Sequence, residues 1–369
     1  MADETAEVVI VGGGVLGAST AFHLAELGIT DVVLLERETL ASGSTSKSAG
    51  GVRAQFADEL NIRIALRSIA ELSAFAERVG GEADFVQDGY LFLIDDEADL
   101  ARFREALALQ ASFGVPSREL TPDEALQIVP QLDLDGILGA TFCPLDGRAT
   151  PEAVTTGYAD AARRAGVRVR QGEPAERIEL RDGRIEAVVT PKGRIATGTV
   201  VCAAGVWSKD VGALAGVDIP VEGERRRMWF TPTRGPLPAR VPLTIDFTTS
   251  FYFHGEGPGL AFGGRQLALE EVAEHAARRL PVLADLPIQA DWWGYYEMSP
   301  DHNAIVGEAE EPSRFLYGTG FSGHGFQQAP AVGEHLAELV AGRTPTIDLS
   351  AFDVGRFARG ETRRETFVV

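Results

Sequence analysis

The start of the sequence combines two short apolar runs with a glycine-rich turn between them. A continuous apolar run of four residues is typical of a strand that is buried on both faces. Helical periodicity follows the glycines and ends at a glycine that suits a left-handed helix cap. In chain order the pattern gives a strand at 8–11, the glycines Gly12, Gly14 and Gly17, a helix from Leu16 to Gly28, and a strand at 32–35.

The spacing of the three glycines indicates a nucleotide-binding βαβ unit. Gly12 permits a tight turn out of the strand, Gly14 lets the backbone approach a pyrophosphate, and Gly17 lets the helix pack close to the strand. The phosphates then lie at the positive end of the helix dipole, near free N–H groups. We therefore expect a dinucleotide at the start of this helix.

Glu36 ends the second strand, nineteen residues after Gly17. A carboxylate at this place accepts hydrogen bonds from the ribose hydroxyls of a dinucleotide and disfavours a 2′-phosphate. The glycine spacing alone is weak evidence, because residues 318–323 repeat it without an acidic strand end after them. Strands, helix and acid in register make the prediction of a dinucleotide specific, but they do not distinguish NAD from FAD.

Two further segments carry glycines beside polar residues. Residues 41–56, ASGSTSKSAGGVRAQF, follow Glu36 directly, and their hydroxyls and N–H groups can hold a phosphate or a flavin edge. A flexible surface linker is the alternative. Residues 315–340, FLYGTGFSGHGFQQAPAVGEHLAELV, predict a strand, a glycine-rich turn, and a helix that starts at about Gln327 or Gln328 and ends at Val340. The first turn of that helix carries unpaired N–H groups.

The βαβ unit, the GSTSKSAGGVR loop and the GFSGHGFQQAPAVGEHLAEL segment resemble the D-amino-acid oxidase superfamily of flavoproteins. The last segment is most similar to the sarcosine oxidase and dimethylglycine dehydrogenase branch. This resemblance spans nearly the whole chain and implies that the dinucleotide is FAD. It places the N-terminus of the C-terminal helix at the pyrimidine side of the flavin, where it stabilises the charge of the reduced ring. It also implies oxidation of C–N bonds in amino acids or N-methylated amines.

The resemblance implies an α/β fold in which a Rossmann-like FAD-binding domain is interleaved with an α+β substrate lobe. That lobe is expected to contain a β-rich antiparallel sheet. We expect the FAD-binding domain at 1–85, 141–215 and 300–369, and the substrate-binding domain at 86–140 and 216–299.

Local patterns in the middle of the chain predict individual elements. Helices are expected at 58–79, 96–112 and 151–165, a strand at 90–94, and a capped helix start at Thr121 with Glu124. The β-rich stretches from Pro220 to Trp293 predict the antiparallel sheet. We expect the triplet Arg225 to Arg227 to alternate faces on an edge strand, with an anion site as the alternative.

The resemblance also implies which residues contact the cofactor. Ala175 falls where the family contacts the adenine through backbone atoms, and Ala203, Ala204 and Gly205 fall beside the phosphates. The expected cofactor-binding residues are Gly12, Gly14, Val15, Leu16, Gly17, Glu36, Arg37, Ser44, Thr45, Ser48, Ala49, Gly50, Gly51, Ala175, Ala203, Ala204, Gly205, Trp207, Gly323, His324, Gly325, Phe326 and Gln327.

Four residues are candidates for catalysis or contact with the substrate. Arg53 matches a flavin-proximal arginine of the family, and it could pair a substrate carboxylate or orient the flavin. Tyr252 falls near a family tyrosine that lines the substrate pocket, and His324 could present a ring nitrogen to flavin or substrate. A purely structural role is the alternative for both. Gln327 stands where monomeric sarcosine oxidases have a substrate-binding lysine, and a neutral amide binds a carboxylate more weakly.

Two other departures concern the flavin. Gly294 falls nearest the cysteine that links flavin covalently in monomeric sarcosine oxidases, so we expect non-covalent FAD. Ala261 falls at the lysine credited with promoting the reaction with oxygen. We expect oxidation of secondary (N-methyl) amino acids such as sarcosine, with oxygen as acceptor and hydrogen peroxide as product. The alternatives are a dehydrogenase, or the flavin subunit of a complex, that passes electrons to a partner, and an FAD-binding subunit without amine chemistry.

Charge and composition limit the partners. The net charge of −20 repels phosphate backbones and anionic lipid, so we expect neither nucleic acid nor a membrane surface as a partner. The N-terminus lacks the basic start and apolar stretch of a signal peptide, and this predicts a cytoplasmic location. Cys143 and Cys202 match no metal-ligand spacing, so no metal is expected.

Overall fold

A six-stranded sheet made largely from the apolar runs organises one lobe of the protein. The computed structural model describes residues 4–368; residues 1–3 and 369, which the proposed FAD-binding ranges include, lie outside the described residues. Five strands are parallel, and the last pairs antiparallel at one edge. The order is β19 (Ile305–Glu308), β20 (Phe315–Thr319), β13 (Val200–Cys202), β2 (Val8–Val11), β3 (Val32–Leu35) and β9 (Arg168–Arg170).

Both faces of this sheet are covered, which is why its strands are apolar throughout. Val8 and Ile10 pack with the helical side, in the same cluster as residues of α1 (Val15–Glu26), α2 (Glu59–Ser73), α6 (Pro151–Arg164) and α9 (Gly325–Val340). Val9 and Val11 pack with a small four-stranded sheet and α7 (Ser208–Leu214) on the other side. That sheet has the order β1 (Glu4–Thr5), β12 (Gly193–Ala196), β11 (Arg184–Thr190) and β10 (Arg177–Arg181), and a separate pair joins β4 (Gly51–Val52) to β8 (Gly147–Arg148).

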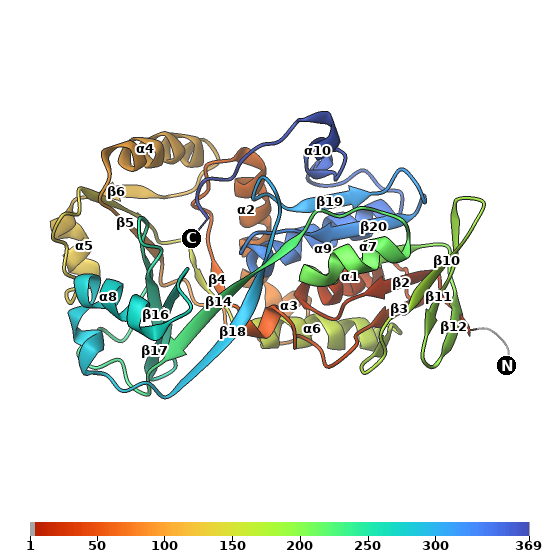
Figure 1. The fold of residues 1–369 in the computed structure, drawn as a ribbon, viewed down its shortest axis with the longest axis horizontal. Coiled ribbons are helices and arrows are strands. Elements are labelled where there is room, and N and C mark those ends of the chain that lie inside the picture. Colours follow the sequence, from red (N-terminus) through yellow and green to blue (C-terminus); the bar gives the residue numbers. More distant parts are fainter. Residues whose placement is uncertain (1–3, 369) are drawn as a thin grey trace.

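An eight-stranded, mostly antiparallel sheet forms the other lobe, beside the first along the long axis of the molecule (Figure 1). Only β15 and β5 pair in parallel. The order is β18 (Ala290–Met298), β14 (Glu222–Phe230), β17 (Gly259–Gly264), β16 (Tyr252–Glu256), β15 (Leu243–Asp246), β5 (Tyr90–Ile94), β7 (Gly139–Cys143) and β6 (Arg118–Leu120). The mixed α/β fold class is therefore confirmed. The division of the chain into two domains remains a proposal, and β7 spans the boundary placed at residue 140.

Arg225 to Arg227 are exposed, buried and half-buried in turn, as expected for alternating faces, but the strand that carries them is not the edge strand of the sheet. Arg225 to Arg227 lie on β14, which pairs with β18 along its whole length and with β17 from Arg227 onward. The edge strand is β18. Arg225 and Arg226 therefore lie where β14 has a paired strand on one side only, and Arg226 is buried while Arg225 is exposed.

The helices follow the sequence patterns closely. The capping box at Thr121 is confirmed, with reciprocal hydrogen bonds between Thr121 and Glu124. The helix expected at 58–79 is broken at Ala74 into two helices. The helices are α1 (Val15–Glu26), α2 (Glu59–Ser73), α3 (Phe75–Arg78), α4 (Glu97–Ser112), α5 (Pro122–Ile128), α6 (Pro151–Arg164), α7 (Ser208–Leu214), α8 (Leu269–Arg279), α9 (Gly325–Val340) and α10 (Arg356–Arg359), with short 3-10 turns η1 (Thr45–Lys47), η2 (Gly205–Trp207), η3 (Pro281–Asp285) and η4 (Ser350–Phe352).

The last described residues connect the two lobes. Arg363 forms an ion pair with Asp58 at the start of α2, with the two charged atoms 2.8 Å apart. Four residues later, the ring of Phe367 stacks on Phe103 of α4, with ring centres 4.2 Å apart. Figure 1 shows this segment passing from α10 to its end near α2 and α4. The segment therefore fixes part of the contact between the lobes.

No helix in residues 4–368 is long and apolar enough to cross a membrane. Within the same residues, no group of three or more His, Cys, Asp or Glu side chains is placed to hold a metal ion. Cys143 and Cys202 are both buried and free.

Candidate active site

A cavity of about 1040 Å³ lies between the parallel sheet and the eight-stranded sheet. That volume is at the upper end of the range for ligand pockets. The turn before α1, the loop after β3, the turn before α9, and strands β14 and β18 all contribute to its wall. Of the residues expected to contact the cofactor, only Gly17 and Gly50 do not line it. All four catalytic candidates, Arg53, Tyr252, His324 and Gln327, do.

The turn between β2 and α1 has no room for side chains. A Cβ on Gly12, whose φ is +116°, would lie 2.3 Å from the carbonyl oxygen of Ala203. A Cβ on Gly17 would lie 1.9 Å from the carbonyl oxygen of Gly12, which explains why Gly17 packs the helix without lining the cavity. The N-cap Gly14 leaves the first turn of α1 without a side-chain cap, although Thr45 Oγ1 accepts from the N–H of Val15 at 3.2 Å.

Gly50 also has a structural role. Its φ is +69°, and a Cβ there would lie 2.3 Å from the carbonyl oxygen of Ala149. The residue therefore turns the loop into β4 and brings its neighbours Ala49 and Gly51 to the cavity. The sequence alone does not show that Gly50 shapes the turn while its neighbour Gly51 lines the cavity.

Glu36 is held in place at the end of β3. Its two carboxylate oxygens each accept one backbone hydrogen bond, from Gly13 and from Glu38, both at 2.8 Å. A carboxylate has about four acceptor positions. Glu36 thus retains acceptor capacity toward the cavity, as a ribose partner requires. Close by, the guanidinium of Arg37 lies over the ring of Trp207 at 3.9 Å.

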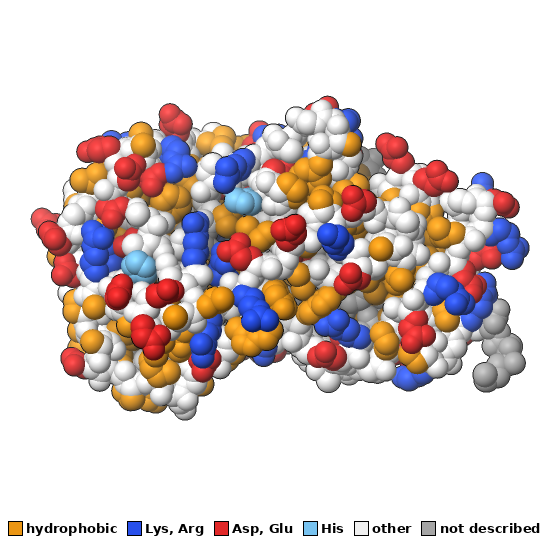
Figure 2. Space-filling model, viewed as in Figure 1, with side chains coloured by type: hydrophobic (Ala, Val, Ile, Leu, Met, Phe, Trp, Pro, Cys, Tyr) orange, Lys and Arg blue, Asp and Glu red, His pale blue; other side chains and the backbone are white. Residues whose placement is uncertain are grey.

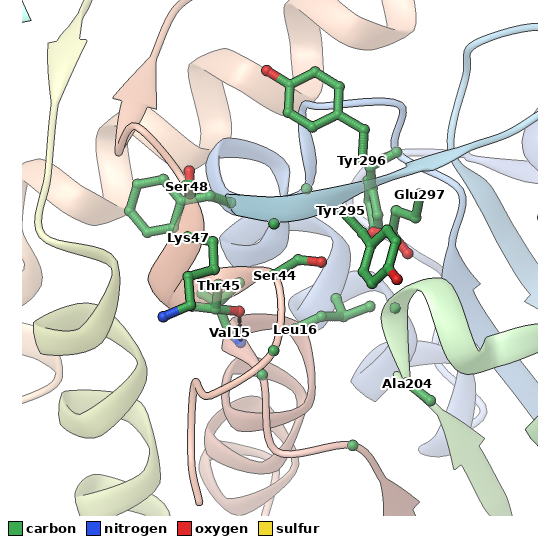
Figure 3. Close-up of a pocket in the computed structure, with 18 of the residues that line it drawn as sticks. Val15, Leu16, Ser44, Thr45, Lys47, Ser48, Ala204, Tyr295, Tyr296 and Glu297 are labelled. Atoms are coloured by element: carbon green, nitrogen blue, oxygen red, sulfur yellow. Dashed lines mark hydrogen bonds between the residues drawn. The ribbon is translucent and has the colours of Figure 1, made fainter. Parts of the chain in front are cut away.

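A half-buried acid, Glu297, lies at the cavity beside the turn before α9. Glu297 of β18 accepts a hydrogen bond of 2.8 Å from the hydroxyl of Thr319, and a Cβ on Gly325 would lie 3.2 Å from its Oε1. Burial raises the pKa of Glu297 to about 7. Figure 3 shows Tyr295 and Glu297 pointing to the side of β18 where Leu16 and Ala204 lie, whereas Tyr296 extends from the opposite side.

Arg53 is surrounded by acceptors from the protein itself. Its guanidinium donates to the carbonyl oxygens of Gln55 and Phe367, and its Nη2 lies 2.9 Å from Nε2 of His324. The side chain also stacks over the ring of Phe56. Burial and the positive charge of Arg53 hold the pKa of His324 well below its usual range. His324 is therefore a neutral imidazole whose Nε2 accepts from Arg53.

The side chain of Gln327 is also hydrogen-bonded to Arg53. Its side-chain oxygen accepts a 2.7 Å hydrogen bond from the backbone N–H of Arg53. The residue that replaces the family's lysine therefore positions the loop that carries Arg53. The sequence motif placed Gln327 at the cavity but could not show this contact.

One wall of the cavity is an apolar face of the eight-stranded sheet. Tyr252 of β16 lies there, only 8% exposed, beside Tyr90, Met228, Leu243 and Ile245. These buried side chains give this wall few polar groups. His254, also on β16, does not line the cavity, and burial lowers its pKa to about 4.

Several residues that line the cavity were not predicted, because their pattern in the sequence was ambiguous. Except for Lys47 in η1, they lie on strands, where aromatic and apolar side chains are usually core. Arg226 was considered only as part of an arginine triplet. The unpredicted residues include Lys47, Tyr90, Arg226, Met228, Leu243, Ile245, Trp292, Tyr295, Tyr296 and Glu297.

The two flavin-related departures have clear structural positions. A Cβ on Gly294 would lie 2.5 Å from Cβ of Lys47, so this position cannot carry a side chain without displacing the loop. Ala261 is fully buried in β17, paired with Phe230 and His254, and it does not line the cavity. Neither Cys143 nor Cys202 lines the cavity.

The described residues fit FAD. The crowded glycine turn, the uncapped start of α1 and the acceptor Glu36 suit the ADP half, while the uncapped start of α9 suits an electron-rich ring. A nucleotide site on a parallel sheet lies next to the apolar face of an antiparallel sheet. This arrangement is that of a flavin-dependent oxidoreductase with a separate substrate lobe. Residues 7–339 match the DAO family, described as FAD dependent oxidoreductase. The chain belongs to this family.

Individual relatives carry related activities in their names. The chain is 30% identical over 381 residues to the mitochondrial sarcosine dehydrogenase of Mus musculus, across 96% of this chain and 41% of that protein. It spans less than half the length of the sarcosine and dimethylglycine dehydrogenases that it matches.

Solved structures match over the full length. The structure of L-proline dehydrogenase from P. horikoshii has a TM-score of 0.91 and 35% identity, across 98% of this chain and 100% of that one. Glycine oxidase from Geobacillus kaustophilus has a TM-score of 0.86 and 25% identity, across 96% and 99%. Both structures are named as enzymes of amino-acid oxidation, and the family match places this chain among the FAD dependent oxidoreductases.

Proposed function

We propose that this protein oxidises the C–N bond of secondary amino acids, such as sarcosine or other N-methyl amino acids, with non-covalently bound FAD. When bound, FAD supplies an electron-accepting N5 that takes a hydride from the carbon next to the amine nitrogen. One observation carries the proposal. The uncapped start of α9, the cationic Arg53 and an apolar sheet face all border the same cavity as the nucleotide turn.

The chain's own residues then perform three tasks. The start of α9 directs N–H groups and partial positive charge at the ring, which favours its reduced, anionic form. Tyr90, Tyr252 and their apolar neighbours exclude water from the reacting carbon. Arg53 and Arg226 place positive charge at the cavity, and nearby positive charge favours the neutral amine over its protonated form. A neutral amine is required because only its lone pair can assist loss of the hydride.

Non-covalent binding is supported by the absence of a thiol at the cavity and by the packing of Gly294. Its backbone lies against Lys47, and any side chain there would collide with that residue. The other candidate nucleophile at the turn, His324, is held by Arg53 through its Nε2.

Two electron acceptors are consistent with this chemistry. Oxygen as acceptor, with hydrogen peroxide as product, is the first candidate from the resemblance to sarcosine oxidases. A partner protein or carrier is the second, as in a dehydrogenase. The second is favoured by Ala261, which is neither basic nor at the cavity, and by the dehydrogenase names of the relatives.

The test is to mix the FAD-loaded protein anaerobically with sarcosine, proline and N-methyl amino acids, and to follow the flavin absorbance. Bleaching by a secondary amino acid is the expected result. Admission of oxygen then distinguishes the acceptors: rapid recovery with peroxide selects the oxidase, and recovery slower than turnover with an artificial acceptor selects the dehydrogenase. No bleaching with any secondary amino acid would refute the substrate class.

A further inference from the structure

Arg53, the arginine expected near the flavin, is not free to bind a carboxylate. It already donates to two backbone carbonyl oxygens and contacts His324. A substrate carboxylate would have to displace the carbonyl of Phe367, at 2.5 Å, and leave it buried without a partner. Gln327 is likewise engaged, through the backbone of Arg53. The cavity therefore needs another cation to hold an anionic substrate.

Arg226 has a hydrogen-bonding edge without an acceptor. Its side chain is 8% exposed and lies over the ring of Tyr296, with 4.6 Å to the ring centre. Nη1 donates to Glu224 at 2.5 Å and to the carbonyl of Arg225 at 3.1 Å. In contrast, Nε is buried and has no acceptor within residues 4–368, and no acceptor among these residues is in hydrogen-bond contact with Nη2. The Nε and Nη2 edge of a guanidinium is the one that binds a carboxylate through two parallel bonds.

Arg226 also lines a second cavity, of about 480 Å³. This cavity is bordered by the segment that connects the lobes. Arg102, Arg265 and Arg364 line it together with the carboxylates of Glu224 and Glu365. Arg265 donates to the carbonyl of Val368, and within the described residues neither Arg265 nor Arg364 forms an ion pair.

Four arginines thus line this cavity together with two glutamates. The net charge is −20, and Figure 2 shows acidic and basic side chains interspersed over the face it displays. Positive side chains that line one cavity raise the local concentration of small anions there. Burial raises the pKa of Glu365, so this carboxyl opposes an incoming anion less than an ordinary glutamate would.

We propose that Arg226 anchors the carboxylate of the amino-acid substrate through its Nε and Nη2 atoms, and that the arginine-lined second cavity is the route by which that carboxylate arrives. The inference rests on the proposed function for the identity of the substrate, but it concerns a binding site that can be measured without turnover. Arg226 lies on β14 beside Met228, and Met228 and Tyr252 border the apolar face that would hold the rest of the substrate.

The binding test uses propionate, which carries a carboxylate but no amine, with propionamide as the uncharged control. Each is titrated into the FAD-loaded protein, and the flavin difference spectrum gives the dissociation constant. Arg226→Gln is expected to weaken propionate binding about tenfold to a hundredfold, because a charge-assisted bidentate contact is lost. Arg226→Lys is expected to recover part of the loss, since it keeps the charge but not the planar fork. Arg225→Gln is the matched control, because it removes the same charge from the exposed face of β14.

The route is tested by stopped-flow association of propionate. Arg265→Gln combined with Arg364→Gln is expected to slow association several-fold and to reduce its dependence on ionic strength. Equal losses for Arg225→Gln and Arg226→Gln, or an unchanged dissociation constant for Arg226→Gln, would overturn the anchor. Association that is indifferent to the double variant would overturn the route. If propionate binds as expected but no secondary amino acid bleaches the flavin, the proposed function fails while the carboxylate site stands.

Discussion

Nη2 of Arg53 lies 2.9 Å from Nε2 of His324, and this contact joins the loop after β4 to the turn before α9. The two segments are 271 residues apart in the chain. Gln327 adds a second link to the same loop through the backbone of Arg53. The two elements that would hold opposite parts of the flavin are therefore fixed relative to one another before the cofactor binds.

Replacement of Arg53 tests this link. Arg53→Lys removes the planar fork that satisfies the carbonyls of Gln55 and Phe367, so we expect the free energy of unfolding to fall by roughly 1–3 kcal/mol. Urea denaturation at saturating FAD measures this free energy of unfolding. Arg63→Lys is the control, because Arg63 forms an exposed pair with Glu59 and its replacement should cost less than about 0.5 kcal/mol. Equal stability of the two variants would contradict the structural role of Arg53.

The glycine turn predicts a contrast between two substitutions. Gly12→Ala places a Cβ 2.3 Å from a backbone oxygen at the phosphate site, so we expect the purified protein to lose most of its FAD. Gly28→Ala, at a φ of +85° with nothing within 4 Å, is expected to cost about 1 kcal/mol of stability and to retain FAD. The ratio of flavin to protein absorbance measures both. Full FAD content in Gly12→Ala would show that the turn does not bind the phosphates.

The mode of flavin attachment gives a third prediction. No thiol lines the cavity, and Gly294 is packed against Lys47, so acid denaturation is expected to release all of the flavin into the supernatant. Absorbance of the supernatant and fluorescence of the washed protein pellet measure this directly. Flavin that stays with the pellet would require a covalent bond to another residue at the cavity.

Glu297 predicts a pH dependence. Because burial raises its pKa from 4.5 to about 7, its contribution to stability is fully present below pH 4.5 and is lost as the pH rises to 7. Relative to Glu297→Gln, the apoprotein should lose on the order of 3 kcal/mol of unfolding free energy between about pH 4 and pH 8. Urea denaturation of both proteins at each pH measures the difference. Parallel curves for the two proteins would contradict the raised pKa.

Local sequence patterns were sufficient to predict the elements of the proposed nucleotide site. The strand at 8–11, the glycines and the helix after them are fixed by hydrophobic periodicity and backbone sterics, and these act between near neighbours. The capping box at Thr121 was predicted for the same reason. The resemblance to a flavoprotein family then brought residues 323–327 to the same site.

The sequence by itself determined the nucleotide turn, the class of cofactor and most of the residues around it. Only the tertiary structure decided which guanidinium nitrogens lack an acceptor. Arg53 and Arg226 are the same residue type, and each follows a pattern that permits an anion site. Arg53 is occupied by the carbonyl oxygens of Gln55 and Phe367, whereas Nε of Arg226 has no acceptor among the described residues. The acceptors around a buried guanidinium come in part from segments that are distant in the sequence. No local sequence pattern therefore predicts them.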